Sequence, residues 1–314
     1  MTKKETTNVS LTNISPVSYG VSFSAKQCNN FGIDQEKVLK WLISKGFRRF
    51  RLMTYWDDCQ PAPEFHDFAK LDKQLKIIKK HGGIVSLCLG ARQPRWPESH
   101  WPDWAWNLPK NERDEALLKF IETVIKRYKN NEIIISYQLE NEALLGQFGE
   151  RSEVDRRRLI KEFKLVKMLD SSRPIIMTTS TSWGIPLRRP IPDIVGFSYY
   201  QVLFNPKMQK YTTAFHKPFL DQLRTWAIKI IFNKPSFIHE LQLEPWGPKA
   251  IWEMDIKEQN KSMNPDQIRK NLSLAHKTGL KSMDLWGGEW WYYRTVIQKD
   301  PSIWQAVKTG LEQG

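Results

Sequence analysis

The chain of 314 residues lacks the long apolar segments that would place it in a membrane. It contains no uninterrupted apolar run of 18 or more residues, so the sequence predicts no transmembrane helix. Residues 1–16 include lysines that no apolar segment follows, so we do not expect a secretory signal peptide. We therefore expect a cytoplasmic protein for the sequence as given, with a trimmed leader or anchor as the alternative.

Cysteine is scarce, and metal-binding patterns are missing. Cys28, Cys59 and Cys88 are the three cysteines, and none of them has the CxxC spacing of zinc or redox sites. Histidines do not cluster with acids or cysteines at the spacing of metal ligands either. We expect reduced, buried thiols, no metal and no cofactor.

Short segments rich in β-forming residues alternate along the chain with longer amphipathic segments. The segments expected to be strands are 17–24, 47–54, 83–90, 132–139, 174–181, 193–200, 235–241 and 281–287. The segments with helical spacing of apolar residues are 36–46, 71–81, 113–128, 154–169, 219–231, 265–278 and 301–311. The link at 184–192 is short and rich in proline, which predicts a single helical turn.

This alternation predicts parallel strands, because parallel neighbours need long crossover connections. Eight such units fit an α/β fold of one closed (β/α)₈ barrel, typically about 250 residues long. An open doubly wound sheet is the alternative, but the first strand is not followed by a glycine-rich phosphate-binding turn. We expect residues 1–14 to be a flexible tail and residues 15–314 to form the barrel, with an extended tryptophan-rich loop after the third strand.

Carboxylates follow two of the predicted strands, at the barrel face where functional residues gather. The fourth strand runs into Glu140, Asn141 and Glu142, and the seventh ends at Glu240. An unpaired carboxylate inside a barrel is costly, so these residues are not expected to be core filling. A pair of carboxylates across the barrel mouth is what cleavage of a glycosidic bond requires.

In these residues the chain resembles the clan A glycoside hydrolases, the TIM-barrel clan of the family 5 cellulases and mannanases. The resemblance extends to Arg51 at the end of strand two, Tyr200 at the end of strand six and Trp286 at the end of strand eight. It implies a retaining β-glycoside hydrolase that works by double displacement. In that mechanism Glu142 is the general acid and base and Glu240 is the nucleophile.

The resemblance also implies supporting roles. Arg51 and Tyr200 would keep the nucleophile ionised, Asn141 would bind the sugar 2-hydroxyl, and Trp286 would form the floor of the sugar site. A transglycosylase would use the same residues with a sugar acceptor in place of water. The alternative that is not an enzyme is a catalytically silent barrel that binds glycans.

Several neighbours leave alternatives open. By strand alternation we expect Glu140 to point to the same side as Glu142, either as the acid itself or as a structural partner. Glu244 is the alternative nucleophile. Tyr199 replaces Tyr200 if the strand register shifts by one residue. His239 either lines the site or is hydrogen-bonded within the barrel, and residues 48–49 are expected to face helices or solvent.

Tryptophan is in surplus, with 14 residues. Those that follow predicted strands are Trp56, Trp96, Trp101, Trp104, Trp106, Trp183, Trp246, Trp290 and Trp291. We expect an extended sugar-binding cleft in which Trp96, Trp183, Trp246 and Glu289 contact the substrate. The alternative is that indoles pin the loop after strand three against the barrel. Trp226 lies on a predicted helix and is expected to pack in the core.

The chain is strongly basic, with a net charge of +14. The simplest interpretation is a solvated basic surface. An anionic glycan is the alternative, because arginines occur in the predicted loops of the active face: Arg92, Arg95, Arg188, Arg189 and Arg294. No nucleic-acid-binding motif is present. We therefore expect an oligosaccharide or polysaccharide partner and no nucleic acid.

Overall fold

The computed structural model describes residues 17–146, 148–179, 184–214 and 217–313. Within these ranges, parallel strands close into an eight-stranded barrel in the order β1-β10-β9-β6-β5-β4-β3-β2. The strands are β1 Ser18–Phe23, β2 Arg49–Leu52, β3 Ile84–Leu89, β4 Ile134–Leu139, β5 Ile175–Thr179, β6 Ile194–Tyr199, β9 Ser236–Gln242 and β10 Ser282–Trp286. The predicted (β/α)₈ barrel is confirmed. The expected tail at residues 1–14 lies outside the described residues.

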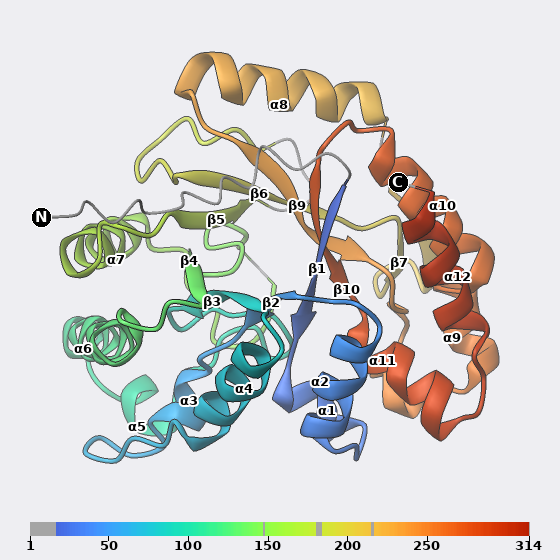
Figure 1. Ribbon diagram of the computed structural model, residues 1–314. Coiled ribbons are helices and arrows are strands. Elements are labelled where there is room, and N and C mark those ends of the chain that lie inside the picture. The colour runs from blue at the N-terminus through green and yellow to red at the C-terminus, as the bar shows by residue number, and fades with distance from the viewer. Residues whose placement is uncertain (1–16, 147, 180–183, 215–216, 314) are drawn as a thin grey trace, which may run out of the picture.

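Helices surround the barrel (Figure 1). The longer ones are α2 Gln35–Ser44, α4 Ala69–Lys80, α6 Lys110–Tyr128, α7 Arg156–Leu169, α8 Pro218–Phe232, α10 Pro265–His276 and α12 Ser302–Glu312. Shorter ones are α1 Ala25–Asn30, α3 Trp56–Cys59, α5 Asp103–Trp106, α9 Ile256–Ser262 and α11 Gly288–Tyr292, with a 3₁₀ turn at Ile251–Glu253 and a π-helical turn at Tyr293–Ile297. In the part of the chain that the structure describes, no helix has the length and apolar character needed to cross a membrane.

Local sequence signals set the ends of the helices. The side chain of Asp34 accepts hydrogen bonds from backbone N–H groups in the first turn of α2, and Asn264 does the same for α10. Pro265 occupies the first turn of α10, where its missing N–H costs nothing. Gly46 and Gly279 follow α2 and α10 with φ angles of 99° and 75°, a conformation that favours glycine. These caps explain why the helices were predictable.

The segment between β5 and β6 differs from the prediction. The described residues 184–192 contain no helical turn, so that prediction was wrong. Pro186, Pro190 and Pro192 each lack the N–H that a helical hydrogen bond needs. A second difference follows β6, where β7 Val202–Asn205 and β8 Lys210–Thr213 pair as an antiparallel hairpin outside the barrel.

Two arginines of β2 face the barrel interior. Arg49 and Arg51 are two residues apart, so both point to the same side of the strand. Arg49 is buried and forms an ion pair with Asp284 at 2.8 Å. The expectation that Arg49 faces helices or solvent was therefore wrong, whereas Arg48 is exposed as predicted.

Hydrogen bonds connect the Arg49–Asp284 ion pair to Arg51, which lies nearer the carboxyl end of β2. His239 Nδ1 lies 2.7 Å from a carboxylate oxygen of Asp284, and its Nε2 lies 3.0 Å from the side-chain oxygen of Gln138. The same Gln138 oxygen accepts a hydrogen bond from Arg51 Nε. His239 is thus held within the barrel, the second of the two alternatives open for it.

Six of the nine tryptophans predicted to follow strands lie in the hydrophobic core or, like Trp104 and Trp106, pack against it. Trp56, Trp101, Trp290 and Trp291 are buried, and the ring of Trp56 stacks on Phe120 with centroids 5.3 Å apart. The loop between β3 and α6 is therefore pinned against the barrel by its tryptophans, which was the alternative to a long sugar cleft. The three cysteines are free and buried, as predicted.

Candidate active site

The carboxylate of Glu240, on β9, is held from two sides. Arg51 Nη1 donates to its Oε1 at 2.8 Å, and the Tyr200 hydroxyl donates to its Oε2 at 2.9 Å. Both groups are buried, and a cation and a donor at these positions favour the ionised carboxylate. The structure thus brings together the three residues expected around a nucleophile. Tyr199, the alternative to Tyr200, lies on the helix side of β6, where burial, and after it the charge of Asp221, raises its pKa.

The guanidinium of Arg51 donates hydrogen bonds to both Glu240 and the side-chain amide of Asn141. Arg51 Nη2 donates to Asn141 Oδ1 at 2.9 Å. The same oxygen accepts hydrogen bonds from Gln138 Nε2 at 3.1 Å and from Thr178 Oγ1 at 3.2 Å. Three donors therefore fix the orientation of the amide, and its NH₂ group is directed away from them.

Glu142 lies just beyond β4 in a left-handed backbone conformation, with φ 46°. Its N–H donates to Thr178 Oγ1, and Ser198 Oγ donates to its Oε1, both at 2.7 Å. Burial, and after it the charge of Glu240, raises the pKa of Glu142 to about 7. Glu142 can therefore hold a proton near neutral pH.

Glu140 does not share this site. Its carboxylate accepts hydrogen bonds from the backbone N–H groups of Ala91, at 3.1 Å, and Arg92. The strand ends at Leu139, and positive φ angles at Glu140 and Glu142 break the side-to-side alternation of strand residues. Glu140 is thus a structural partner of the loop after β3, and the expectation that it points to the side of Glu142 was wrong.

A third carboxyl group, Glu98, was missed by the sequence analysis. It lies in the loop after β3, is buried, and accepts a hydrogen bond from Asn141 Nδ2 at 3.2 Å. Burial, and then the nearby charges of Glu240 and Glu142, raise its pKa to about 8. In the sequence it resembles any loop carboxylate, and no spacing pattern distinguishes it.

Arg95 of the same loop covers Trp286. Its guanidinium carbon lies 4.0 Å from the centroid of the indole, which is only 5% exposed. Arg95 also binds the carboxylates of Glu244 and, at 2.8 Å, Glu289. Glu244 is therefore engaged with Arg95, whereas Glu240 has the surroundings expected of a nucleophile. Glu289 is also bound by the backbone N–H of Ser24, and its contact with substrate stays a prediction.

The backbone of this loop is strained where it presents these side chains. Arg95 and Glu98 have φ angles of 89° and 71°, which are unfavourable for residues other than glycine. Backbone hydrogen bonds from Gln93 to Glu98, at 2.9 Å, and from His100 to Ala91, at 2.7 Å, close the loop on itself. Such strain is typical of functional sites, where the surrounding structure holds it in place.

The other expected substrate contacts are dispersed. Trp246 is half-buried and meets Tyr200 edge-on, with ring centroids 5.6 Å apart, so it borders the site. Trp96 is largely exposed at the surface. Trp183 lies outside the described residues.

Three of the five arginines that suggested an anionic glycan bind other groups of the protein. Arg92 donates to the carbonyl of Leu145 and to Ser152, and Arg294 binds Asp300. Arg95 has the two carboxylate partners described above. Among the five, Arg188 and Arg189 are exposed, and Arg188 also lines the cavity beside Glu142 described below, so an anionic substrate stays a prediction.

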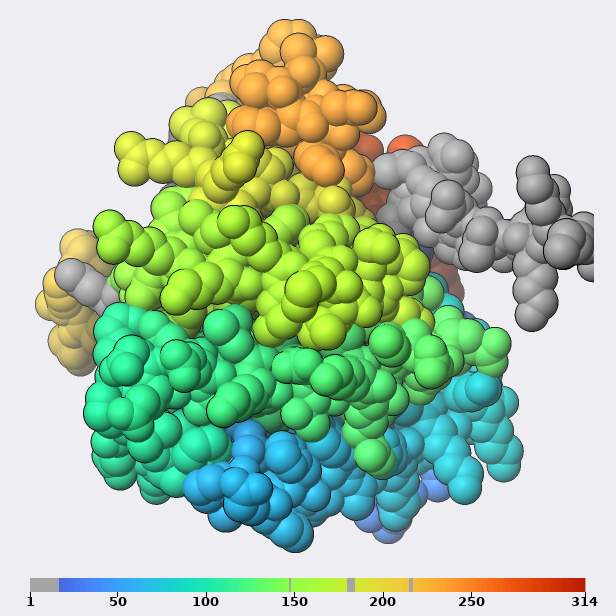
Figure 2. All heavy atoms as spheres, turned by 90° about the vertical axis from the view of Figure 1, so that its left-hand side faces the viewer, coloured from blue at the N-terminus to red at the C-terminus, as the bar shows by residue number. Residues whose placement is uncertain are grey.

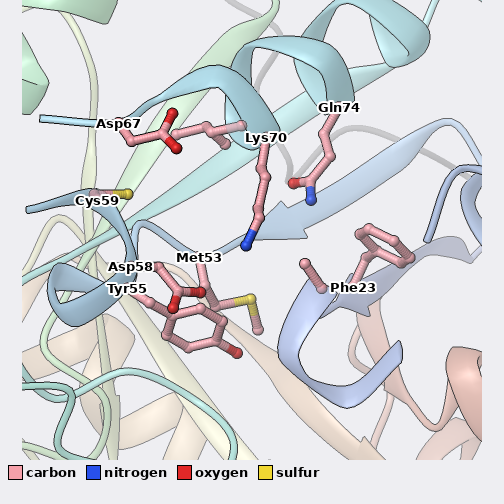
Figure 3. Close-up of a pocket in the computed structure, with 10 residues that line it drawn as sticks. Phe23, Met53, Tyr55, Asp58, Cys59, Asp67, Lys70 and Gln74 are labelled. Carbon is pink, nitrogen blue, oxygen red and sulfur yellow. The ribbon is translucent and has the colours of Figure 1, made fainter. Parts of the chain in front are cut away.

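A cavity of about 410 Å³ opens beside Glu142. Its walls include Leu144, Met177, Thr178 and Ile185. A second cavity, between the segment that follows β2 and helices α3 and α4, is lined by residues that include Tyr55, Asp58 and Lys70 (Figure 3). It measures about 40 Å³, which suits water molecules and not a sugar ring. The cavity at Glu142 is the one of the two large enough for part of a substrate.

The described residues contain no group of three or more His, Cys, Asp and Glu side chains arranged to hold a metal ion.

The sequence matches no family model, and no curated protein sequence matches it. Solved structures are similar. An exo-β-1,4-mannosidase from Opitutaceae bacterium strain TAV5 matches with a TM-score of 0.60 and 13% identity, over 95% of this chain and 59% of that chain. A GH5_18 protein from Streptomyces cattleya, in complex with GlcNAc, matches at 0.66 and 12%, over 95% and 80%. Native xylanase 10B from Thermotoga maritima matches at 0.62 and 15%, over 95% of both chains. The chain shares the barrel fold of these glycoside hydrolases. It spans less than two thirds of the mannosidase.

Proposed function

We propose that the protein is a retaining β-glycoside hydrolase with Glu240 as nucleophile and Glu142 as acid and base. The observation that carries this proposal is the arrangement around Arg51. Its guanidinium contacts both Glu240 and Asn141, while Glu142 has a pKa raised to about 7. The double-displacement reaction requires one carboxyl group that is protonated at neutral pH and one that is ionised.

In the first step Glu240 attacks the anomeric carbon while Glu142 gives its proton to the departing oxygen. The glycosidic bond breaks, and an ester forms between the sugar and Glu240. In the second step Glu142, now a carboxylate, takes a proton from water, and the oxygen of that water attacks the anomeric carbon. The ester is cleaved, Glu240 regains its negative charge and Glu142 regains its proton. No cofactor takes part.

The electrostatics support this change of role. The charge of Glu240 is the second cause, after burial, of the raised pKa of Glu142. Formation of the ester removes that charge, so the pKa of Glu142 falls when it must act as a base. Arg51 and Tyr200 stabilise Glu240 as the carboxylate that leaves in the second step.

The cavity beside Glu142 fits the leaving group, because the general acid must contact the departing oxygen. About 410 Å³ is within the usual size of a small-molecule site. We infer an oligosaccharide or polysaccharide substrate whose leaving part occupies this cavity. A transglycosylase would use the same groups, with the cavity holding a sugar acceptor.

A panel of aryl β-glycosides tests the proposal. Wild type is expected to hydrolyse at least one of them, and Glu142→Ala and Glu240→Ala to lose most of that activity. Glu115→Gln, an exposed carboxylate on α6, is the matched control and should retain it. Glycan binding by a wild-type protein that is inert across the panel would favour the silent barrel.

A further inference from the structure

Helix α8 directs Asp221 and Arg224 toward the barrel and most of its large apolar residues toward solvent. Asp221, Arg224 and Ile228 are the buried residues of this helix. The exposed apolar side chains are Phe219 (53%), Leu223 (52%), Trp226 (63%), Ile230 (65%) and Ile231 (60%). The expectation that Trp226 packs in the core was therefore wrong. Leaving these side chains in water is unfavourable, and exposed apolar patches commonly mark a binding surface.

Four of these residues form a continuous stripe. Phe219, Leu223, Trp226 and Ile230 follow one another at intervals of four, three and four residues, which places them on one face of the helix. The stripe extends over about 16 Å of the helix axis. Figure 2 shows α8, in orange, at the apex of the molecule, where it stands out from the barrel. We call these four residues the α8 stripe.

The exposed charges beside the α8 stripe are positive. Within residues 217–232, all of which the structure describes, Lys217 and Lys229 are the exposed charged residues. The acidic residue of the helix, Asp221, lies on the opposite, buried face. Lys277, which directly follows α10, is also exposed. It lies near α8, because its carbonyl accepts a hydrogen bond from Gln222 of α8 at 2.8 Å. The whole chain carries a net charge of +14.

We propose that the α8 stripe docks the protein on the surface of an anionic lipid membrane. The apolar side chains enter the boundary between headgroups and acyl chains, and the indole of Trp226 lies at the level that tryptophan favours in membranes. Lys217 and Lys229 then contact the phosphates of the headgroups. This combination of an apolar face and flanking lysines is typical of helices that lie in a membrane interface.

Charge favours this occupant over a second copy of the chain. Two α8 stripes packed together would bring the lysines of both copies close to one another. No exposed acidic side chain in residues 217–232 would compensate them. Anionic headgroups would compensate the positive charge of the lysines. The α8 stripe would contact the membrane surface without crossing the membrane. The proposal does not depend on the glycosidase reaction.

Flotation of the full chain with lipid vesicles tests the proposal. We expect binding to phosphatidylcholine vesicles that contain phosphatidylglycerol, and binding at least about tenfold weaker without the anionic lipid or at high salt. The Trp226→Gln/Ile230→Gln variant should bind at least about tenfold more weakly, because the apolar contribution is lost. Lys229→Glu should also bind more weakly, with a reduced dependence on salt.

Met168→Gln is the matched control, because Met168 is an apolar residue of α7 that is 75% exposed. It should bind like wild type, and circular dichroism should show all variants folded. Equal binding of the wild type to neutral and anionic vesicles would overturn the proposal, as would no binding to either. A wild type that binds no vesicles but self-associates, and loses that self-association in Trp226→Gln/Ile230→Gln, would show that the α8 stripe binds a second copy of the chain.

Discussion

The guanidinium of Arg95 lies over the indole ring of Trp286, with 4.0 Å between its central carbon and the ring centroid. Glu98 of the same loop accepts a hydrogen bond from Asn141 Nδ2. The loop after β3 therefore covers two of the groups, Trp286 and Asn141, for which the resemblance to clan A glycoside hydrolases implies sugar contacts. We predict that this loop shifts when substrate enters, and that the ion pairs of Arg95 with Glu244 and Glu289 oppose the shift.

We predict that Arg95→Ala lowers the free energy of unfolding by about 3–5 kcal/mol. The substitution leaves Glu244 and Glu289 buried without their cation. Denaturant unfolding at neutral pH measures the change. Arg269→Ala is the control, because the ion pair of Arg269 with Asp266 is exposed and such pairs contribute less than about 1 kcal/mol. Equal losses in the two variants would show that the Arg95 ion pairs are unimportant.

The pH profile tests the role of Glu142. Its raised pKa keeps it protonated below about pH 7, so kcat/KM should be high there and fall as pH rises through that value. Glu142→Gln should lower kcat by about 10²–10⁴-fold on substrates with poor leaving groups. It should also remove the alkaline decline on an activated substrate. A decline that persists in the variant would assign it to another group.

Tyr200→Phe removes the hydroxyl that donates to Glu240 Oε2 at 2.9 Å. A hydrogen bond to a charged group contributes about 1.5–3 kcal/mol, so we expect kcat to fall roughly 10- to 100-fold. Tyr199→Phe is the neighbouring control, and it should leave kcat nearly unchanged because its ring lies on the other side of β6. A larger effect from Tyr199→Phe would mean that the strand register is wrong.

Glu98→Gln should make stability depend less on pH. Because its folded-state pKa is raised to about 8, Glu98 favours the folded state most when protonated. That contribution is lost as pH rises from the unfolded value, about 4.3, through about 8. The variant should therefore gain stability relative to wild type over this range, by roughly 2–5 kcal/mol at alkaline pH. A constant difference between the two proteins across the range would contradict the raised pKa.

The residues on barrel strands could be predicted, because strand ends converge at one face. Arg51, Tyr200 and Glu240 each lie at or near the end of a strand, so the strand assignment and the resemblance to clan A glycoside hydrolases together predicted that they meet. Arg49 was misplaced although its spacing from Arg51 puts both side chains inside the barrel. The error came from treating charge as evidence of exposure, which fails when a partner such as Asp284 is also inside.

The loop after β3 could not be predicted in the same way. Positive φ angles at Arg95 and Glu98 decide where their side chains point, and no sequence pattern marks them. The tryptophans show a related limit. An indole after a strand can line a cleft or fill the core, and Trp56 and Trp101 do the latter. Trp226 has helical spacing that identifies one face of α8, but the spacing does not say which face meets the barrel.

The most direct test of the central claim is azide rescue of Glu240→Ala on an activated aryl β-glycoside, with the product identified by NMR. The small anion should occupy the space of the missing carboxylate and attack the anomeric carbon from the same side. The account predicts little turnover without azide, restored turnover with it, and a glycosyl azide of inverted α configuration. A β-configured product, or full activity without azide, would contradict Glu240 as the nucleophile.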